Sequence, residues 1–234
     1  MSQREKPADG IIYHVYNRGV EKREIFKSDS DRSRFVHALQ IFNKTEKIFN
    51  AGRAFDEFKL IEVGLQSEQK LVKILAFALM PNHYHLMLEQ IGESGITDFM
   101  RKIGTGYTNY FNQKYQRVGP LFQGKYKLAG VFEHRHLLYL PHYIHLNPLD
   151  MYEPEWRSGR VADVEKAMRF LKSYRWSSLH EYISNAAFAP LVDRGRVQEL
   201  FENQSDYEKN LIEWLIQGDR SDLPTITFEP PDAD

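Results

Sequence analysis

The pattern of hydrophobic and polar positions predicts a short series of strands and helices in the first two thirds of the chain. Residues 11–17 (IIYHVYN) are rich in β-branched and aromatic residues and end at Arg18-Gly19, which is typical of a strand closed by a turn. Leu71–Met80 is a nearly continuous apolar run, as expected for a strand that is buried on both faces. His83–Gln90 follows Pro81-Asn82 and predicts a second strand, antiparallel to the first through a tight turn.

Helices are predicted between and after these strands. Asp29 or Ser30 is a candidate cap for a first helix, with apolar residues spaced on one face behind it. A second helix is predicted from about Thr97-Asp98 to Tyr115, weakened locally by two glycines. Residues 121–132 predict a loop and a strand, and 136–147 a further helix with its firm start at Pro141.

This order of elements predicts the fold class α+β, with a small antiparallel sheet and helices packed on one face. Residues 50–70 show no clean period and predict a loop. Residues 173–183 predict a short helix over the core, and the remainder is expected to be helical in parts before a disordered TFEPPDAD tail. We therefore expect one main domain over residues 1–183 and a C-terminal extension over 184–234.

Composition and charge exclude several classes of protein. The chain of 234 residues holds no Cys, which excludes disulfide scaffolds, thiolate zinc sites and cysteine nucleophiles. No apolar run is long enough for a membrane span and the N-terminus lacks the features of a signal peptide, so we expect a cytoplasmic protein without a membrane partner.

The net charge of −1 is an average over an uneven chain. Residues 188–234 hold eleven acidic and four basic side chains, and the rest of the chain therefore sums to +6. Within that rest, 99–132 hold six basic residues among eight aromatic ones and no acidic residue. Because cations track phosphates and aromatic faces stack on unpaired bases, this stretch predicts a nucleic-acid contact. An amphipathic helix with solvated lysines is the structural alternative.

Two pairs of polar residues are candidates for chemistry. His83 and His85 occupy positions i and i+2 of a predicted strand, so their imidazoles leave the same face. Tyr143 and Asn147 are four residues apart in a predicted helix and share a face there. Either pair alone is as compatible with polar surface or ordinary packing as with a site. Together, two imidazoles and an amide oxygen would form a metal site with open positions suited to Mg²⁺ or Mn²⁺, and a nearby tyrosine would be a candidate nucleophile on phosphorus.

Five strings in the chain resemble a known family. They are YHVYNRG (13–19), ALMPNHYHLMLE (78–89), RVGPLFQGKYK (117–127), YIHLNP (143–148) and RWSSLHEY (175–182). Their content and order are similar to those of the REP-associated tyrosine transposases, chromosomal relatives of the insertion-sequence transposases that carry the HUH motif and a single catalytic tyrosine.

The resemblance implies a ferredoxin-like fold and an enzyme that cuts and rejoins single-stranded DNA beside hairpins of palindromic repeats. His83-Tyr84-His85 matches the HUH motif, with tyrosine in place of a bulky apolar middle residue. Tyr143 matches the nucleophile, which would form a 5′-phosphotyrosine, and Asn147 matches the third ligand of a divalent metal. A homodimer and a monomer are both compatible with the resemblance.

The resemblance and the basic stretch together predict a set of DNA contacts. Each is a cationic or aromatic side chain, either at the end of the first strand or within 99–132. They are Arg18, Lys102, Lys114, Arg117, Lys125, Tyr126 and Lys127. Two alternatives stay open. One is a catalytically silent regulator that binds hairpin DNA or RNA on the same scaffold, and the other is an unrelated metal hydrolase, for which Glu89 is the local candidate base.

Overall fold

The structure, a computed structural model, describes residues 6–46, 69–184 and 191–218. The TFEPPDAD tail and all but the last two residues of the predicted loop at 50–70 lie outside these ranges. Its first half contains the strands and helices of a small sheet domain. They are β1 (Ile12–Arg18), α1 (Asp29–Ile41), β2 (Val72–Met80), β3 (His83–Gln90), α3 (Gly95–Lys114) and β4 (Lys127–Val131).

A helical second half follows the last strand. Its elements are α4 (His134–Leu146), the 3₁₀ turns η3 (Asn147–Met151) and η4 (Pro154–Ser158), and the helices α5 (Val164–Ser173), α6 (Leu179–Ile183), α7 (Gly195–Gln198) and α8 (Gln204–Gln217).

The four strands form one sheet in the order β2-β3-β1-β4, and every pair of neighbours is antiparallel. The elements follow one another as β-α-β-β-α-β, with the first strand inside the sheet and the last strand at its edge. This is the ferredoxin-like arrangement. The predicted α+β class with an antiparallel sheet is therefore confirmed. β1 lies in the centre, and β4 is an edge strand.

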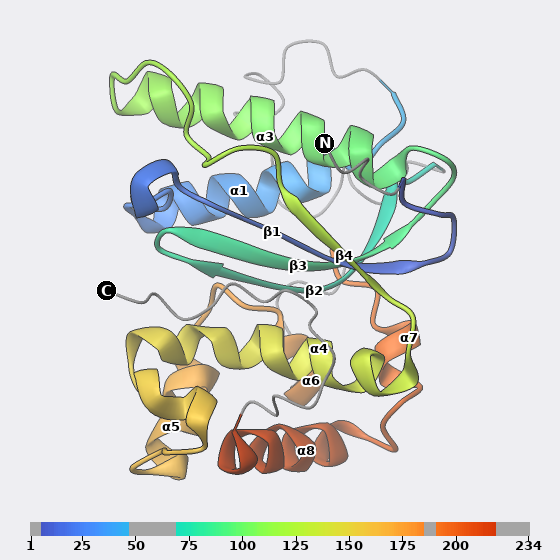
Figure 1. Cartoon of the computed structure of the whole chain (residues 1–234), viewed down its shortest axis with the longest axis vertical. Helices are drawn as coiled ribbons and strands as arrows, with labels where there is room; N and C mark the ends of the chain where they lie inside the picture. The colour runs from blue at the N-terminus through green and yellow to red at the C-terminus, as the bar shows by residue number, and fades with distance from the viewer. Residues whose placement is uncertain (1–5, 47–68, 185–190, 219–234) are drawn as a thin grey trace.

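Helices cover both faces of this sheet (Figure 1). α1 and α3 lie together on one face, as the order of elements predicted. α4 lies against the opposite face, and α5, α6 and α8 form a further layer beyond it. The second covered face differs from the expectation of helices on one face only, and it explains why β2 is buried on both sides.

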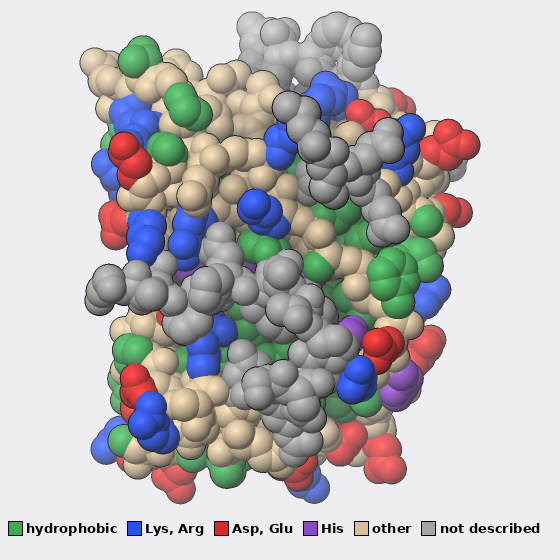
Figure 2. Space-filling view, viewed as in Figure 1, with side chains coloured by type: hydrophobic (Ala, Val, Ile, Leu, Met, Phe, Trp, Pro, Cys, Tyr) green, Lys and Arg blue, Asp and Glu red, His purple; other side chains and the backbone are tan. Residues whose placement is uncertain are grey.

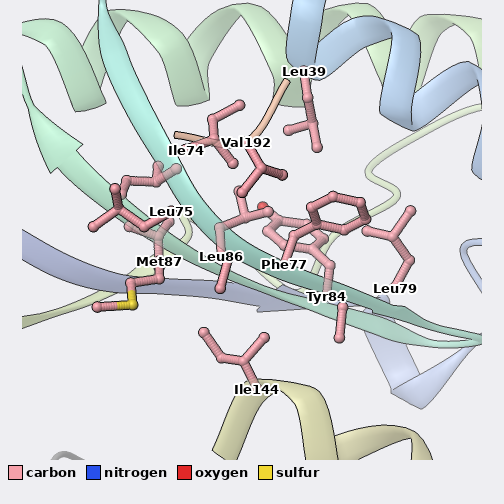
Figure 3. Close-up of a cluster of buried hydrophobic side chains, with 14 of the residues drawn as sticks. Leu39, Ile74, Leu75, Phe77, Leu79, Tyr84, Leu86, Met87, Ile144 and Val192 are labelled. Carbon is pink, nitrogen blue, oxygen red and sulfur yellow. The ribbon is translucent and has the colours of Figure 1, made fainter. Parts of the chain in front are cut away.

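The core lies between the helices and the strands. Phe77, Leu86 and Met87 are fully buried, and Ile144 reaches toward the sheet from α4 (Figure 3). Because successive side chains of a strand point to opposite faces, Tyr84 packs on the α1 and α3 side, where its ring lies 5.0 Å from that of Phe35. His83 and His85, on either side of Tyr84, therefore project to the α4 side.

Two helix boundaries differ from the sequence prediction. The N-cap of α1 is Ser28, one residue before the expected Asp29, and its backbone N–H donates to the Asp31 carboxylate at 3.0 Å. α4 begins at His134 and continues through Pro141 rather than starting there. Proline removes one backbone donor, but the burial of α4 between the sheet and α8 offsets this loss.

In the described part of the chain, no helix combines the length and the apolar character that crossing a membrane requires.

Candidate functional site

Two neighbouring strands bring three histidines to the face that α4 covers. In the β1–β3 register, Tyr16 lies opposite His85 and Arg18 lies opposite His83. His14 precedes Tyr16 by two residues, so its side chain leaves the same face. The rings of His83 and His85 are 5.2 Å apart between centroids, and those of His14 and His85 are 5.0 Å apart. The sequence predicted the His83–His85 pair but not His14.

A hydrogen bond with another side chain fixes one nitrogen of each ring in the pair. His85 Nδ1 lies 2.7 Å from His14 Nε2, and His83 Nδ1 lies 2.5 Å from Asn82 Oδ1. In metal sites, one imidazole nitrogen binds the ion while the other is held by an outer partner that sets the orientation of the ring. In this arrangement, His83 and His85 would bind an ion through their Nε2 atoms.

Burial keeps the imidazoles of His14 and His85 neutral. It lowers the pKa of His14 to about 3. It also holds the pKa of His85 well below its ordinary value, with further lowering from His14, His83 and two arginines. Neutral imidazole is the form that binds a metal ion. The protonation state at neutral pH therefore suits ligation.

Tyr143 lies directly against these histidines. Its ring meets that of His85 edge-on at 5.6 Å and that of His14 edge-on at 5.9 Å. The side chain is 1% exposed and comes from the middle of α4, whose central turns are buried against the sheet. The tyrosine and the histidine pair, about 60 residues apart in the sequence, are thus neighbours in the fold.

Asn147 and Arg157 complete the group around Tyr143. Asn147 is fully buried, and its Nδ2 donates to the Tyr143 carbonyl at 2.7 Å. Arg157 Nη2 donates to Asn147 Oδ1 at 3.1 Å and to Asp150 Oδ2 at 2.8 Å. The guanidinium carbon also lies 5.2 Å from the centre of the Tyr143 ring. Arg157 lies outside every motif quoted above, so no pattern in the sequence predicts its role.

The pKa of Tyr143 reflects two opposing influences. Burial raises it above the ordinary value of a phenol, while the charge of Arg157 and hydrogen bonds from Arg157 and Asn147 lower it. The net shift is upward. Arg157 is therefore the group that most favours the phenolate in this site.

The donor set fits a hard divalent ion. Two imidazoles and one amide oxygen would leave coordination positions for water and phosphate oxygens. Among the residues that the structure describes, no cluster of three or more His, Asp or Glu side chains could hold a metal. A metal at Tyr143 would accordingly depend on the amide of Asn147 as its third protein ligand.

The residues predicted to contact DNA separate into two groups. Arg18 and Lys127 lie on the same face as the histidine pair, because Lys127 is paired with Tyr16 and Tyr16 with His85. Lys125 and Tyr126, in the loop before β4, are exposed and half-buried respectively. These four side chains border the sheet edge formed by β4.

The other three predicted cations have partners inside the fold. Lys102 Nζ donates to the backbone carbonyls of Lys44 and Glu46. Arg117 donates to Asn112 Oδ1 at 2.8 Å. The third, Lys114, lies in a larger network around a buried carboxylate.

Lys114 forms an ion pair of 2.6 Å with Asp31, which is fully buried. Tyr110 and Tyr115 donate to the same carboxylate at 3.0 and 2.7 Å. Burial raises the pKa of Asp31, but these hydrogen bonds outweigh it and hold the pKa below its ordinary value. Part of the basic, aromatic stretch thus serves the packing of α3 on α1.

Glu89 lies far from the site. It forms an ion pair with Lys73 at 2.7 Å and a second with Arg196 at 3.4 Å. Four residues along a strand correspond to about 13 Å, so its carboxylate cannot act as a base on water held at His85. This distance removes the base that the metal-hydrolase interpretation requires.

The C-terminal helices pack against the face of α4 that points away from the sheet. His145, on the far face from Tyr143, bonds Tyr207 Oη at 2.6 Å and Ser178 Oγ at 2.8 Å. The Tyr139 ring lies 4.7 Å from that of Trp214 in α8. The described part of the acidic extension thus packs on the helix that carries Tyr143.

Comparison with known proteins shows what the region around this site is similar to. Residues 36–147 match the family model described as "Transposase IS200 like". This region of the chain is therefore similar to the IS200-like transposases. The resemblance inferred from the five strings is confirmed, and the matched region contains His83, His85, Tyr143 and Asn147. It ends before Arg157.

One solved structure that the IS200-like chain matches is described as "Structure of the REP associates tyrosine transposase bound to a REP hairpin", with a TM-score of 0.49 and 11% sequence identity over 78% of this chain and 84% of that chain. No curated protein matches the chain.

Proposed function

We propose that the protein is a metal-dependent nickase and strand transferase of single-stranded DNA, and that it cuts beside hairpins through a 5′-phosphotyrosine intermediate. One observation carries this proposal. Tyr143 packs edge-on against His85, and its hydroxyl is held by Arg157 and Asn147, within the region that matches the IS200-like transposases. A tyrosine fixed beside two metal-binding imidazoles is the arrangement that attack on a phosphodiester needs.

The reaction can be described from the residues of the chain. The Tyr143 hydroxyl loses its proton and its oxygen bonds to the scissile phosphorus. The bond from phosphorus to the 3′ oxygen breaks, and that oxygen takes up a proton as a free 3′-hydroxyl. The phosphate stays on Tyr143, so the energy of the broken bond is conserved for rejoining and no nucleotide cofactor is consumed.

Arg157 and the metal ligands have different electrostatic roles in this reaction. Arg157 favours the phenolate by lowering the pKa of Tyr143 against the effect of burial. His83, His85 and Asn147 would hold Mg²⁺ or Mn²⁺, which supplies polarisation of the scissile phosphate when bound. Asp150 accepts from Arg157 at 2.8 Å and keeps the guanidinium beside the tyrosine.

The positive charge around the site supports DNA as the substrate. Arg18 and Lys127 border the histidine face, and phosphate contacts of this kind bind DNA without regard to sequence. Hairpin DNA with single-stranded flanks is the substrate that the family resemblance implies, and we propose it for this protein.

The decisive experiment is a covalent-adduct assay. A labelled single-stranded hairpin with flanks is incubated with Mn²⁺ and protein, and the product is resolved on a denaturing gel. We expect an adduct with wild-type protein, none with Tyr143→Phe, and an undiminished adduct with Tyr139→Phe, a control on the same helix. An adduct that survives in Tyr143→Phe would remove Tyr143 from its role.

Two additional measurements examine the ligands and the substrate contact. His83→Ala and His85→Ala should abolish the adduct while hairpin binding in anisotropy measurements persists. The salt dependence of binding should fall by about one to two units of log–log slope in Lys125→Ala/Lys127→Ala if both amines contact phosphates. Lys102→Ala is the matched control, because its amine is bound to backbone carbonyls. Wild-type protein that binds hairpins but forms no adduct would favour the silent regulator instead.

A further inference from the structure

The C-terminal helix α8 has no part in the reaction described above, although it packs on the helix that carries Tyr143. It holds three acidic residues, Asp206, Glu208 and Glu213, and one basic residue, Lys209. Figure 2 shows Asp and Glu side chains at the end of the molecule that α8 forms in Figure 1. An acidic surface repels the phosphates of DNA. An effect of α8 on the reaction would therefore pass through the contacts of its inner face.

The end of α8 lies directly on the turn that carries Arg157. Gly218 caps the helix at φ 74° and ψ −178°, a backbone conformation that is open almost only to glycine. A Cβ there would lie 2.4 Å from the Gly159 nitrogen, 2.8 Å from the Ser158 carbonyl carbon and 2.9 Å from the Arg157 carbonyl oxygen. All three atoms belong to the backbone of η4 and its cap.

The approach is equally close from the side of η4. Gly159 ends this turn in the left-handed region, at φ 70°, and a Cβ there would lie 2.9 Å from the Ile216 carbonyl oxygen. Gly106 in α3 also has a close neighbour, but that neighbour is the Phe42 ring, whose Cε2 would lie 2.5 Å from a Cβ. A side chain can shift at moderate cost, whereas the neighbours of Gly218 are backbone atoms of a folded turn. Gly159 and Gly218 thus join η4 to α8 backbone to backbone.

The same helix is fixed to α4 at two points before it reaches η4. Near the start of α8, Tyr207 Oη lies 2.6 Å from His145 Nδ1. Near its end, the Trp214 ring lies 4.7 Å from the Tyr139 ring. Tyr143 projects from the opposite face of α4, toward the histidines. Since α8 contacts α4 along its length and η4 at its cap, it sets the spacing between these two elements.

The guanidinium of Arg157 requires such a constraint. Its side chain is 15% exposed, and partners must offset the cost of removing this charge from water. Those partners, Asn147 and Asp150, belong to η3, and the guanidinium carbon lies 5.2 Å from the centre of the Tyr143 ring. Two 3₁₀ turns rather than one continuous helix lead from α4 to Arg157. The contact at Gly218 limits how far this segment can move.

We propose that Gly218 is a positioning residue, through which α8 holds the Arg157 guanidinium beside Tyr143 during attack on the phosphate. Gly159 is its counterpart on η4. Neither glycine touches the substrate, and both act through Arg157. This inference rests on the proposed function, because it concerns the same nucleophile. It gives the described part of the acidic C-terminal extension a role in the chemistry, as the element that fixes a cation at the tyrosine.

The perturbation is Gly218→Ala. An ordinary contact of a Cβ is 3.4 Å or more, so the Gly159 nitrogen, at 2.4 Å, must move away by about 1 Å. A displacement of this size can lower a reaction rate by about a hundredfold. We expect the rate of Tyr143 adduct formation to fall by about that factor, while hairpin affinity in anisotropy measurements stays at the wild-type value. An unchanged rate would overturn the proposal.

A milder variant covers the case in which Gly218→Ala fails to fold in thermal melts. Asparagine tolerates the left-handed region, so Gly159→Asn adds little backbone strain and perturbs mainly the 2.9 Å approach to the Ile216 carbonyl oxygen. It should lower the rate in the same direction by a smaller factor. A wild-type rate in folded Gly159→Asn would contradict the proposed contact.

A double-mutant cycle tests whether Gly218 acts through Arg157. In the Arg157→Met background, Gly218→Ala should change the rate by less than about threefold, because the group that it displaces is absent. A loss of the same factor in both backgrounds would overturn the proposal, since it would show that the two residues act independently.

Two controls separate positioning from strain and from lost stability. Gly92→Ala introduces a side chain at φ 65°, where a Cβ meets nothing within 4 Å. Leu39→Ala truncates a fully buried side chain of α1, on the other face of the sheet. Both should form the adduct at the wild-type rate below their melting temperatures. A hundredfold loss in Leu39→Ala would mean that lost stability alone explains the effect of Gly218→Ala.

A spectroscopic measurement tests the same contact without DNA. In protein labelled with ¹³C at Cζ of tyrosine, the Tyr143 resonance is the one that Tyr143→Phe removes. Arg157→Met should shift this resonance, and Gly218→Ala should shift it in the same direction. Gly92→Ala and Leu39→Ala should leave it in place. An unmoved Tyr143 resonance in Gly218→Ala would overturn the proposal.

Failure of this inference and failure of the proposed function give different results. If wild type forms no adduct, the proposed function fails, and the Tyr143 resonance still decides whether α8 positions Arg157. If the adduct forms and neither its rate nor the resonance changes in Gly218→Ala, the positioning role alone is wrong.

Discussion

His142 makes the stability of the protein sensitive to acid. It precedes Tyr143 on α4, is fully buried, and lies against Tyr207 and Phe201 at ring distances of 4.5 and 5.3 Å. Neither ring nitrogen has a hydrogen-bond partner among the described residues. Burial lowers the pKa of this imidazole to about 3.

The size of the effect follows from the difference between the folded and unfolded states. In the unfolded chain the imidazole takes up a proton near its ordinary pKa of about 6.5, whereas the folded protein excludes the proton down to about pH 3. The stability that neutral His142 contributes is thus present above pH 6.5 and is lost as the pH falls toward 3. At pH 5 the loss is about 2 kcal/mol, because each pH unit below 6.5 corresponds to about 1.4 kcal/mol.

The perturbation that isolates this contribution is His142→Leu, a change of similar volume that removes the titrating group. The free energy of unfolding is measured in urea at pH 7.5 and at pH 5 for wild type and variant. Other buried histidines titrate equally in both proteins, so the variant should lose about 2 kcal/mol less than wild type between the two values of pH, or about 4–8 °C less in Tm.

The control is His134→Leu, at an exposed position in the first turn of the same helix. It should follow the wild type at both values of pH. An equal loss of stability in wild type and His142→Leu would refute the reasoning, because it would mean that His142 takes up its proton equally in the folded and unfolded states.

Three further predictions concern packing and catalysis. Asp31→Ala leaves the Lys114 ammonium without its carboxylate and should lower the free energy of unfolding by about 3 kcal/mol, measured in urea. Gly106→Ala should destabilise by about 1–3 kcal/mol through overpacking, and a melt at or above the wild-type Tm would contradict the close approach at that glycine. Arg157→Met should shift the pH profile of cleavage to higher pH because the pKa of Tyr143 rises, whereas Arg157→Lys should shift it less; a profile that does not move would exclude this role of Arg157.

The sheet could be predicted from the sequence because its strands carry their burial pattern locally. Val72–Met80 is apolar except for Lys73 since both faces of β2 are covered, and His83–Gln90 matches the predicted strand residue for residue. The position of the second helical layer could not be predicted, because the sequence of a buried helix does not indicate which face of a sheet the helix covers. Pro141 was misleading for a related reason: a local rule about proline was overridden by tertiary packing of α4.

The candidate site shows the same division. His83 and His85 share a strand face and Tyr143 and Asn147 share a helix face, so short-range spacing was enough to pair them. His14 and Arg157 join the group only through strand register and through the 3₁₀ turns after α4. No periodicity connects residue 14 with residue 85, or residue 157 with residue 143. His14 and Arg157 could therefore be identified only from the folded structure.

The basic stretch 99–132 has two roles, and the sequence alone does not separate them. The stretch 99–132 lacks acidic residues, and on solvated surfaces charges of both signs normally mix. Part of that imbalance is compensated internally, since Asp31 of α1 supplies the carboxylate for Lys114 and two tyrosines. Lys125 and Lys127 are exposed and lie beyond the end of α3, outside the network around Asp31. The positive charge left for a phosphate backbone is therefore concentrated at the edge strand, where the two faces of the sheet meet.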